Sequence, residues 1–393
     1  MNDFDDTFDR PQGKAGERKA GLAVRMARRA VLQQLGALRH GRLQIQDALG
    51  TSVAGGISGP ASIDVRVRIT DLSAWLDIAS GGTIGAAEAY MAGKWHSSDL
   101  LAAMRLLVSN RTVMDGLETG MARLGSTLLR LAHWQHRNTR TGSRRNIHAH
   151  YDLGDALFSL FLDPSMMYSA AVFPHAEATL EEASRHKLDL ICRKLELQPD
   201  DHLLEIGTGW GGFAIHAASR YGCRVTTTTI SREQHDWARE EIAAAGLADR
   251  VTLLLDDYRD LRGRYDKVVS IEMIEAVGAR YLDTYTAQCS KLLEPHGAML
   301  LQAITIQDQV YEEALKSVDF IQRFIFPGSF IPSVTAITDS VRSSTDMKVF
   351  HLEDIGPHYA TTLRRWRENF FAQLPEVRRL GYPEREVEAL VAL

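Results

Sequence analysis

The feature that most constrains the fold is a regular alternation of apolar runs and helical patterns between residues 202 and 305. Short runs rich in Leu, Val and Thr predict strands at LLEIG, CRVTTTTI, VTLLL, DKVVSIE and AMLLQAIT. Helical patterns separate several of them, at GFAIHAASRYG, 232–245 and 280–293. Because strands and helices in strict order form βαβ units, we predict an α/β domain with a doubly wound parallel sheet over residues 146–393.

The chain before residue 146 has a different texture. Period-2 alternation in IDVRVRI predicts a strand with one solvent-exposed face, and glycine-rich segments lie on either side of it. We therefore predict a small α+β domain over residues 14–118. A disordered acidic tail over 1–13 is expected before it, and a basic connector over 119–145 is expected after it.

The net charge of -5 conceals two basic segments. Residues 14–42 hold eight Lys and Arg against one Glu, a net +7, and residues 119–151 hold six Arg and no acid, a net +6. The remainder therefore carries -18. Such segregation indicates an anionic partner. Since the connector lacks the glycine-aromatic signatures of RNA-binding modules, we expect an anionic phospholipid membrane and no nucleic acid.

A helix is expected over residues 18–39, where five arginines fall within a sector of about 100° and apolar residues fill most of the rest. This pattern fits a helix that lies on a bilayer, with guanidinium groups at phosphates. It fits equally a helix that docks on its own domain and leaves a basic face in solvent. The sequence leaves both interpretations open.

The composition, 45% hydrophobic and 24% charged, is that of a globular chain. No apolar run reaches about 18 residues, and the first ten residues carry four aspartates instead of a basic segment. We therefore expect a cytoplasmic protein, peripheral on the inner face of the cell membrane. Three cysteines without metal-type spacing predict neither a zinc site nor a disulfide framework.

The most informative segment is EIGTGWGG, residues 205–212, where a predicted strand meets a helix. Its glycines permit a tight turn and let backbone N–H groups approach a ligand. A nicotinamide enzyme would place Asp or Glu at the end of the second strand, which here ends in Thr-Ile-Ser. An acidic residue followed by G-x-G-x-G, without a phosphate-binding lysine, resembles the Rossmann-like class I S-adenosylmethionine methyltransferases.

Residues 146–380 resemble the cyclopropane-fatty-acyl-phospholipid synthases and the related mycolic acid cyclopropane synthases. The resemblance rests on an ordered set of motifs: HAHYDLGDALFSLFLDPSMMYSAAVF, LEIGTGWGGFAIHAA, TTTTISREQ, SIEMIEAVG, FIFPGSFIPS and IGPHYATTLRRW. GAAEAYMAGKW, within residues 36–110, is similar to the family's N-terminal lipid-associated domain. The family's members continue with a helix and a final strand, so we expect this chain, ending at Leu393, to lack the last strand of the sheet.

The resemblance implies transfer of a methyl or methylene group from S-adenosylmethionine to the C=C bond of unsaturated acyl chains in membrane phospholipids. The product would be a cyclopropane or a methylene- or methyl-branched chain. A small-molecule N- or O-methyltransferase and an inactive lipid-binding relative are the alternatives. A homodimer is compatible with the sequence, which does not define the oligomeric state.

The resemblance, together with polar residues at the predicted strand ends, implies thirteen cofactor-binding positions. They are Tyr168, Ser169, Glu205, Gly207, Thr208, Gly209, Gly211, Thr229, Ser231, Gln234, Asp257, Tyr258 and Arg259. Gln234 can bridge two ribose hydroxyls, and Tyr168 can present its ring face to the sulfonium cation.

Cyclopropane-forming members of the family hold a bicarbonate as base, through a Cys, a Glu, a His, a backbone group and a Tyr. The matching positions here are Ala170, Glu275, Gln302, Ile304 and Tyr359. The Cys and His are thus replaced, and Ala170 offers no polar side chain. This puts bicarbonate and ring closure in question. We expect Glu275 to be the base and the cation to lose a neighbouring proton.

Overall fold

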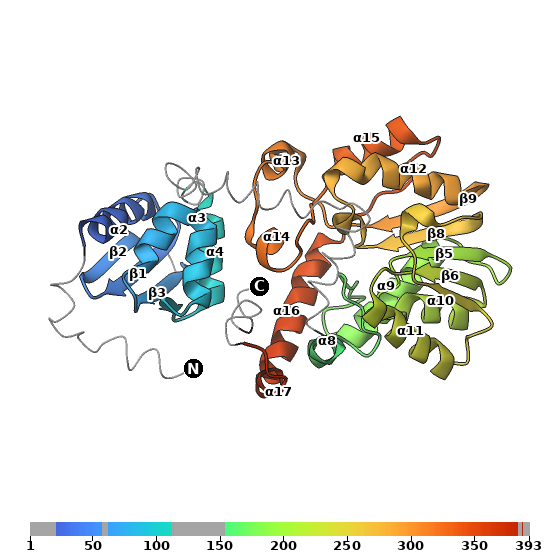
Figure 1. The fold of residues 1–393 in the computed structure, drawn as a ribbon, viewed down its shortest axis with the longest axis horizontal. Helices are drawn as coiled ribbons and strands as arrows, with labels where there is room; N and C mark the ends of the chain where they lie inside the picture. Colours follow the sequence, from blue (N-terminus) through green and yellow to red (C-terminus); the bar gives the residue numbers. More distant parts are fainter. Residues whose placement is uncertain (1–20, 57–61, 112, 114–153, 384–386, 388–393) are drawn as a thin grey trace. The chain divides into compact units, whose positions relative to one another are not determined.

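The computed structural model describes residues 21–56, 62–111, 113, 154–383 and 387 (Figure 1). They form two compact units, one built mainly from residues before 114 and the other mainly from residues after 153. The predicted acidic tail and basic connector lie outside the described residues.

In its described residues, the first unit has a four-stranded sheet with the strand order β2-β1-β3-β4 and the helices α2, α3 and α4. Strand β1 pairs antiparallel with β2 and parallel with β3, which pairs antiparallel with β4. The strands are β1 (Gly41–Asp47), β2 (Gly50–Gly56), β3 (Asp64–Ile69) and β4 (Trp95–Ser97), and the helices are α2 (Leu22–Leu35), α3 (Ala74–Met91) and α4 (Leu100–Ser109). A mixed sheet with its own helices is an α+β arrangement.

Helix α2 docks on this unit through Ala27, Val31 and Leu35, which are buried in its core. Arg28 points inward as well: its Nε donates to Oδ2 of the buried Asp47 at 2.6 Å. The sequence left open whether this helix lies on a bilayer or docks on its own domain. One face of the helix does dock on its own domain. Arg28, predicted to belong to the exposed basic face, instead compensates a buried carboxylate.

The second unit contains a five-stranded parallel sheet in the order β7-β6-β5-β8-β9. Its strands are β5 (His202–Ile206), β6 (Arg224–Thr228), β7 (Val251–Leu254), β8 (Tyr265–Ile271) and β9 (Leu293–Gln302). The helices that flank the sheet are α9 (Leu180–Lys194), α10 (Gly212–Tyr221), α11 (Arg232–Ala244), α12 (Leu282–Leu292) and α15 (Val334–Ser344). The predicted doubly wound α/β fold is confirmed.

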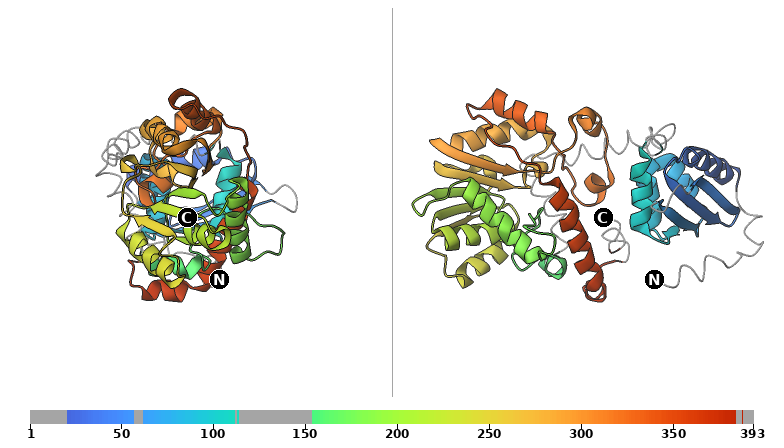
Figure 2. Two further views of the ribbon diagram at one scale, coloured as in Figure 1. Left: turned by 90° about the vertical axis from the view of Figure 1, so that its right-hand side faces the viewer. Right: turned by 180° about the vertical axis from the view of Figure 1, so that it is seen from behind.

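Apolar side chains on both faces of the strands explain why helices cover both sides of this sheet. Leu203 packs with α9, α10 and α11, whereas its neighbour Leu204 packs with α12 and, more peripherally, α15. The helices of these two cores lie on opposite sides of the sheet (Figures 1 and 2). Successive strand residues face opposite sides, so a continuous apolar run requires two covering layers.

The strand order positions the functional site. The chain runs from β5 outward to β7 and then returns to β8 on the other side of β5. In open parallel sheets, ligands bind in the crevice outside the carboxyl ends of the strands, where the order reverses. Among the described residues after Gln302, no strand joins this sheet, and Ile306 and Ser333 form an isolated bridge.

The described residues also form further helices. They are α8 (Asp155–Phe161), α13 (Asp308–Ala314), α14 (Phe320–Phe324), α16 (Gly356–Ala372) and α17 (Leu374–Arg379), with short 3-10 turns η1 (Tyr258–Asp260), η2 (Ile274–Ala276) and η3 (Ala279–Tyr281). A search of the described helices finds none long and apolar enough to cross a bilayer.

Replacing Arg28 with Ala should destabilise the first unit by about 2 kcal/mol, because Asp47 would remain buried without its cation. Amides of β1 should then exchange roughly 30-fold faster in hydrogen-exchange mass spectrometry of the full chain. Arg29→Ala, at an exposed position on the same helix, is the matched control. Equal exchange in the two variants would show that the buried pair contributes nothing.

Candidate active site

The predicted glycine turn follows β5 directly. Gly207, Gly209 and Gly211 have φ values of 105°, 53° and 93°, a region that side chains with a Cβ rarely adopt. The N–H groups of Gly207 and Thr208 both donate to the carbonyl of Thr228, each at 3.0 Å. The turn is thus fixed to the end of β6, and it lies at the carboxyl end of β5, where the strand order reverses.

Glu205 at the end of β5 has its carboxyl inside the protein. It is 2% exposed, and Thr227 Oγ1 donates to its Oε2 at 2.6 Å. Burial raises the pKa of Glu205 to about 8, while the Thr227 hydroxyl and the charge of Lys187 favour the ionised form. This hydrogen bond joins β5 to β6 just before the glycine turn.

The residues after β6 position Gln234. Ser231 caps α11 by accepting from the Gln234 N–H at 3.2 Å, and Thr229 Oγ1 donates to the Gln234 amide oxygen at 3.0 Å. With its amide oxygen bound, Gln234 can offer its NH2 group to a ribose hydroxyl. These three predicted cofactor residues therefore form one hydrogen-bonded group.

The residues after β7 form a charged pair beside an aromatic ring. Both carboxylate oxygens of Asp257 accept from Arg259, from Nε at 2.8 Å and from Nη2 at 2.6 Å. The Arg259 guanidinium lies 5.4 Å from the Tyr258 ring centre. The carboxylate of Asp257 is thus held by its own chain, and the pair fixes the conformation at Tyr258.

Aromatic rings from separate segments gather around Tyr168. The Tyr168 ring centre lies 5.1 Å from that of Phe158, 5.2 Å from that of Trp366 and 6.3 Å from that of Phe326. Tyr359 packs against the same cluster. Ring faces stabilise cations in a water-poor environment, which suits a sulfonium group and a carbocation.

Helix α16 holds the segment that carries Tyr168. The Ala171 N–H donates to the Thr362 hydroxyl at 3.0 Å, and the Phe173 N–H donates to His358 Nδ1 at 3.2 Å. Thr362 is completely buried. A helix that follows the whole sheet in sequence therefore fixes a loop that precedes it.

The structure brings together the residues predicted for the base. Glu275 Oε1 accepts from the Ile304 N–H at 2.6 Å, and Gln302 Nε2 donates to the Ala170 carbonyl at 3.2 Å. Burial first, and then the neighbouring Glu272, raise the pKa of Glu275 to about 8. The same carboxyl groups, after burial, raise the pKa of Tyr359 far above its ordinary value.

Glu272, at the end of β8, lies at the centre of this group, although the sequence did not single it out. Its Oε1 accepts from the Ala170 N–H at 2.9 Å and from Gln302 Nε2 at 2.8 Å. Burial of the carboxyl raises its pKa. The backbone is left-handed, with φ of 45°, which costs about 1–2 kcal/mol for a residue with a Cβ.

Lys187 on α9 is a second residue that the sequence analysis missed. It is 1% exposed, and its Nζ donates to Ser169 Oγ at 2.7 Å. Burial lowers its pKa to about 8, while the nearby acids Glu272, Asp163 and Glu205 favour the charged form. Its pattern in sequence is that of an ordinary helix residue, so only its burial distinguishes it.

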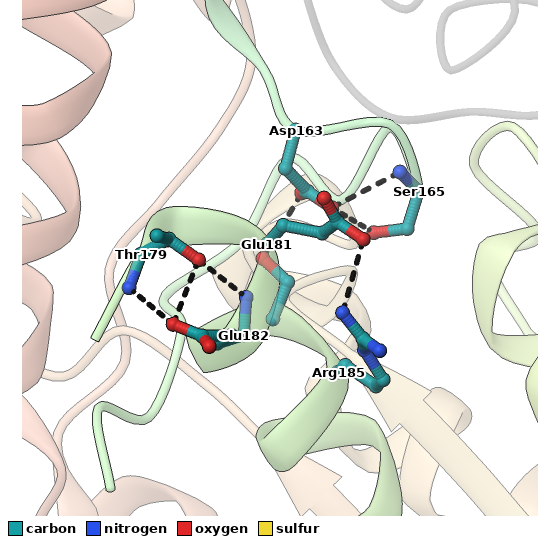
Figure 3. Close-up of polar contacts among 7 residues, drawn as sticks. Asp163, Ser165, Thr179, Glu181, Glu182 and Arg185 are labelled. Carbon is teal, nitrogen blue, oxygen red and sulfur yellow. Dashed lines mark hydrogen bonds and ion pairs between the residues drawn. The ribbon is translucent and has the colours of Figure 1, made fainter. Parts of the chain in front are cut away.

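Hydrogen bonds fix the first turns of α9, the helix that carries Lys187. Thr179 and Glu182 form a reciprocal capping box at the first turn (Figure 3). Asp163 accepts from the Ser184 hydroxyl at 3.0 Å and from the Ser165 hydroxyl at 2.6 Å, the latter pair shown in Figure 3. The loop before Tyr168 is thereby attached to the helix that carries Lys187.

Comparisons with known proteins agree with this geometry. The family model of mycolic acid cyclopropane synthetase matches residues 138–390. Tuberculostearic acid methyltransferase UfaA1 of Mycobacterium tuberculosis is 36% identical over 95% of this chain and 86% of its own length. The cyclopropane-fatty-acyl-phospholipid synthase of Escherichia coli K12 is 38% identical over 82% of this chain and 80% of its own.

Solved structures give the same result for the second unit. Mycolic acid cyclopropane synthase CmaA1, complexed with SAH and CTAB, is 31% identical, with a TM-score of 0.59, over 63% of this chain and 90% of that chain. The cyclopropane synthase MmaA2 of Mycobacterium tuberculosis is 29% identical, with a TM-score of 0.58, over the same shares.

Replacing Gly209 with Ala should weaken S-adenosylmethionine binding at least 10-fold, measured by isothermal titration calorimetry. A methyl group there meets no protein atom within 4 Å, so its effect on binding arises where the ligand approaches the turn. Gly246→Ala is the matched control, since Gly246 also has a positive φ and open space. Both variants should lose about 1 kcal/mol of stability. Equal affinities would show that the cofactor does not approach Gly209.

Proposed function

Since the chain belongs to the mycolic acid cyclopropane synthetase family and is an S-adenosylmethionine-dependent methyltransferase that modifies lipids, we propose that its substrates are unsaturated acyl chains of membrane phospholipids. The observation that carries the proposal is the buried carboxyl pair, Glu272 and Glu275, close to the aromatic cluster around Tyr168. Relatives named for fatty-acyl modification match both units of the chain, which disfavours the small-molecule and inactive alternatives.

The reaction needs the features that these residues supply. The π electrons of the C=C bond form a new bond to the sulfonium methyl carbon, and the electrons of the broken S–C bond stay on sulfur. A carbocation forms on the neighbouring carbon. Because an alkene is a weak nucleophile, the site must exclude water and stabilise the cation, as aromatic rings and carboxylates do. Loss of one proton then gives a neutral lipid.

We propose that the proton is lost without ring closure. Loss from a chain carbon next to the cation gives a methyl-branched unsaturated chain, whereas a methylene branch forms when a hydride first shifts from the methyl-bearing carbon to the cationic carbon and the methyl group then loses the proton. The support is the replacement of the family's Cys and His by Ala170 and Gln302, two positions of the set that holds bicarbonate in ring-forming members. The 36% identical relative is named for tuberculostearic acid, whereas other relatives are named for cyclopropane products. Cyclopropane and methylene products add the same atoms to the lipid, so mass cannot distinguish them.

Purified protein incubated with S-adenosylmethionine and vesicles of a monounsaturated phospholipid should produce lipid with vinylidene or new olefinic proton signals in NMR. Shielded cyclopropane ring protons would contradict branching while supporting methyl transfer. An unchanged lipid, from protein that binds S-adenosylmethionine in calorimetry, would contradict the proposed substrate class.

We further propose that the enzyme reaches its substrate at the cytoplasmic face of the membrane through the outer face of α2. Leu22 and Met26 are 77% and 64% exposed there, and Arg25 and Arg29 are exposed beside them. Exposed apolar and basic side chains on one helix suit an interface of acyl chains and anionic head groups. Residues 14–42, which include this helix, carry a net charge of +7 in the sequence.

The double variant Arg25→Gln/Arg29→Gln should bind anionic phospholipid vesicles roughly 30-fold more weakly in sedimentation assays, at about 1 kcal/mol per arginine. Arg220→Gln/Arg239→Gln makes the same change of charge at exposed positions of the second unit. Binding of the native protein should also fall with added salt. Equal loss in the two double variants, or indifference to anionic lipid, would contradict docking through α2.

A further inference from the structure

The site does not fit a bicarbonate ion. Apart from the hydroxyl of Tyr359, three donors would have to bind it: the Ala170 N–H, the Gln302 amide and the Ile304 N–H. The first two donate to Glu272 Oε1, and the third donates to Glu275 Oε1. Glutamate side chains therefore take all three donors, and a bicarbonate would add a third acidic group to a desolvated pair.

We propose that Glu272 replaces the exchangeable bicarbonate with a carboxylate of the chain itself, and that this carboxylate accepts the proton lost from the substrate. The proposal rests on the proposed function and specifies its base. The carboxylate of Glu272 lies among the groups that would bind the exchangeable anion, at 2.8 Å and 2.9 Å from two of the donors.

The surroundings favour Glu272 over Glu275 as the ionised member of the pair. Glu272 accepts two hydrogen bonds, and the charge of Lys187 favours its ionised form. Glu275 accepts at Oε1, whereas its Oε2 is buried and has no hydrogen-bond partner among the described residues. A buried oxygen without a donor suits a protonated carboxyl better than a carboxylate. The geometry thus shifts the role of base from Glu275, the residue expected from the sequence, to Glu272.

The proton transfer balances without any other reactant. After methyl transfer, the Glu272 carboxylate takes a proton from a carbon next to the cationic centre. The electrons of that C–H bond form the new C=C bond, and the cation disappears. Glu272 is left as a neutral carboxylic acid, which returns its proton to water when the product leaves.

The backbone at residue 272 makes the proposal testable by one substitution. With φ of 45°, the position suits glycine better than glutamate. Glu272→Gly removes the carboxylate and the backbone strain together, and it frees the donors of Ala170 and Gln302 for an added anion. Glu196→Gly is the matched control, because Glu196 is exposed and has φ of 51°.

Methyl transfer from labelled S-adenosylmethionine to monounsaturated phospholipid vesicles should be measured in CO2-free buffer and again with added bicarbonate. The native protein and Glu196→Gly should have the same rate in both buffers. Glu272→Gly should be at least 100-fold slower without bicarbonate and should recover with it in a saturable way. Glu272→Gln should be equally slow and should not recover, because its amide still fills the space.

A native rate that falls when bicarbonate is removed would overturn the proposal, as would full activity of Glu272→Gly in CO2-free buffer. A loss in Glu275→Gln that exceeds the loss in Glu272→Gln would return the role of base to Glu275. Calorimetry with S-adenosylmethionine identifies any variant that is merely misfolded. Failure of the proposed function is separate, since the native protein would then leave the lipid unmodified in both buffers.

Discussion

The removal of charged groups from water at the carboxyl ends of β5, β8 and β9 is the constraint on which the rest of the second unit depends. A carboxyl group in such a place must be hydrogen-bonded, paired with a cation or protonated. Glu272 takes its donors from Ala170 and Gln302, 102 and 30 residues away. Lys187 supplies a charge from α9. The site therefore forms only when the sheet, α9 and the preceding loop are all in place.

The same constraint explains the role of α16. This helix is remote in sequence from the loop it holds, yet the hydroxyl of Thr362 and the ring of His358 fix that loop at two N–H groups. Ala170 and Tyr168 lie on this loop, so α16 places both a donor for Glu272 and an aromatic ring. One short segment of backbone thus connects Tyr168, a residue predicted to bind the cofactor, with Ala170, which donates to Glu272.

The sequence predicted the sheet and the glycine turn because both leave local patterns: apolar runs between helical periods, and glycines where φ is positive. It brought Glu275, Gln302, Ile304 and Ala170 together only through a family resemblance. Glu272 and Lys187 carry no local signal, because a single Glu after a strand or a single Lys on a helix is usually solvated. The prediction that Arg28 lies on the exposed basic face was wrong for the same reason, because its partner Asp47 is 19 residues away.

A base that belongs to the chain differs physically from a bound anion. A bicarbonate must be gathered from solution, at an entropic cost that depends on its concentration, whereas a side chain is present at a fixed effective concentration. The cost of Glu272 is instead a left-handed backbone, about 1–2 kcal/mol, offset by two hydrogen bonds to its carboxylate. Tethering also fixes where the proton is accepted. Because the position of the base decides which C–H bond breaks, the backbone conformation at residue 272 connects the fold to the choice of product.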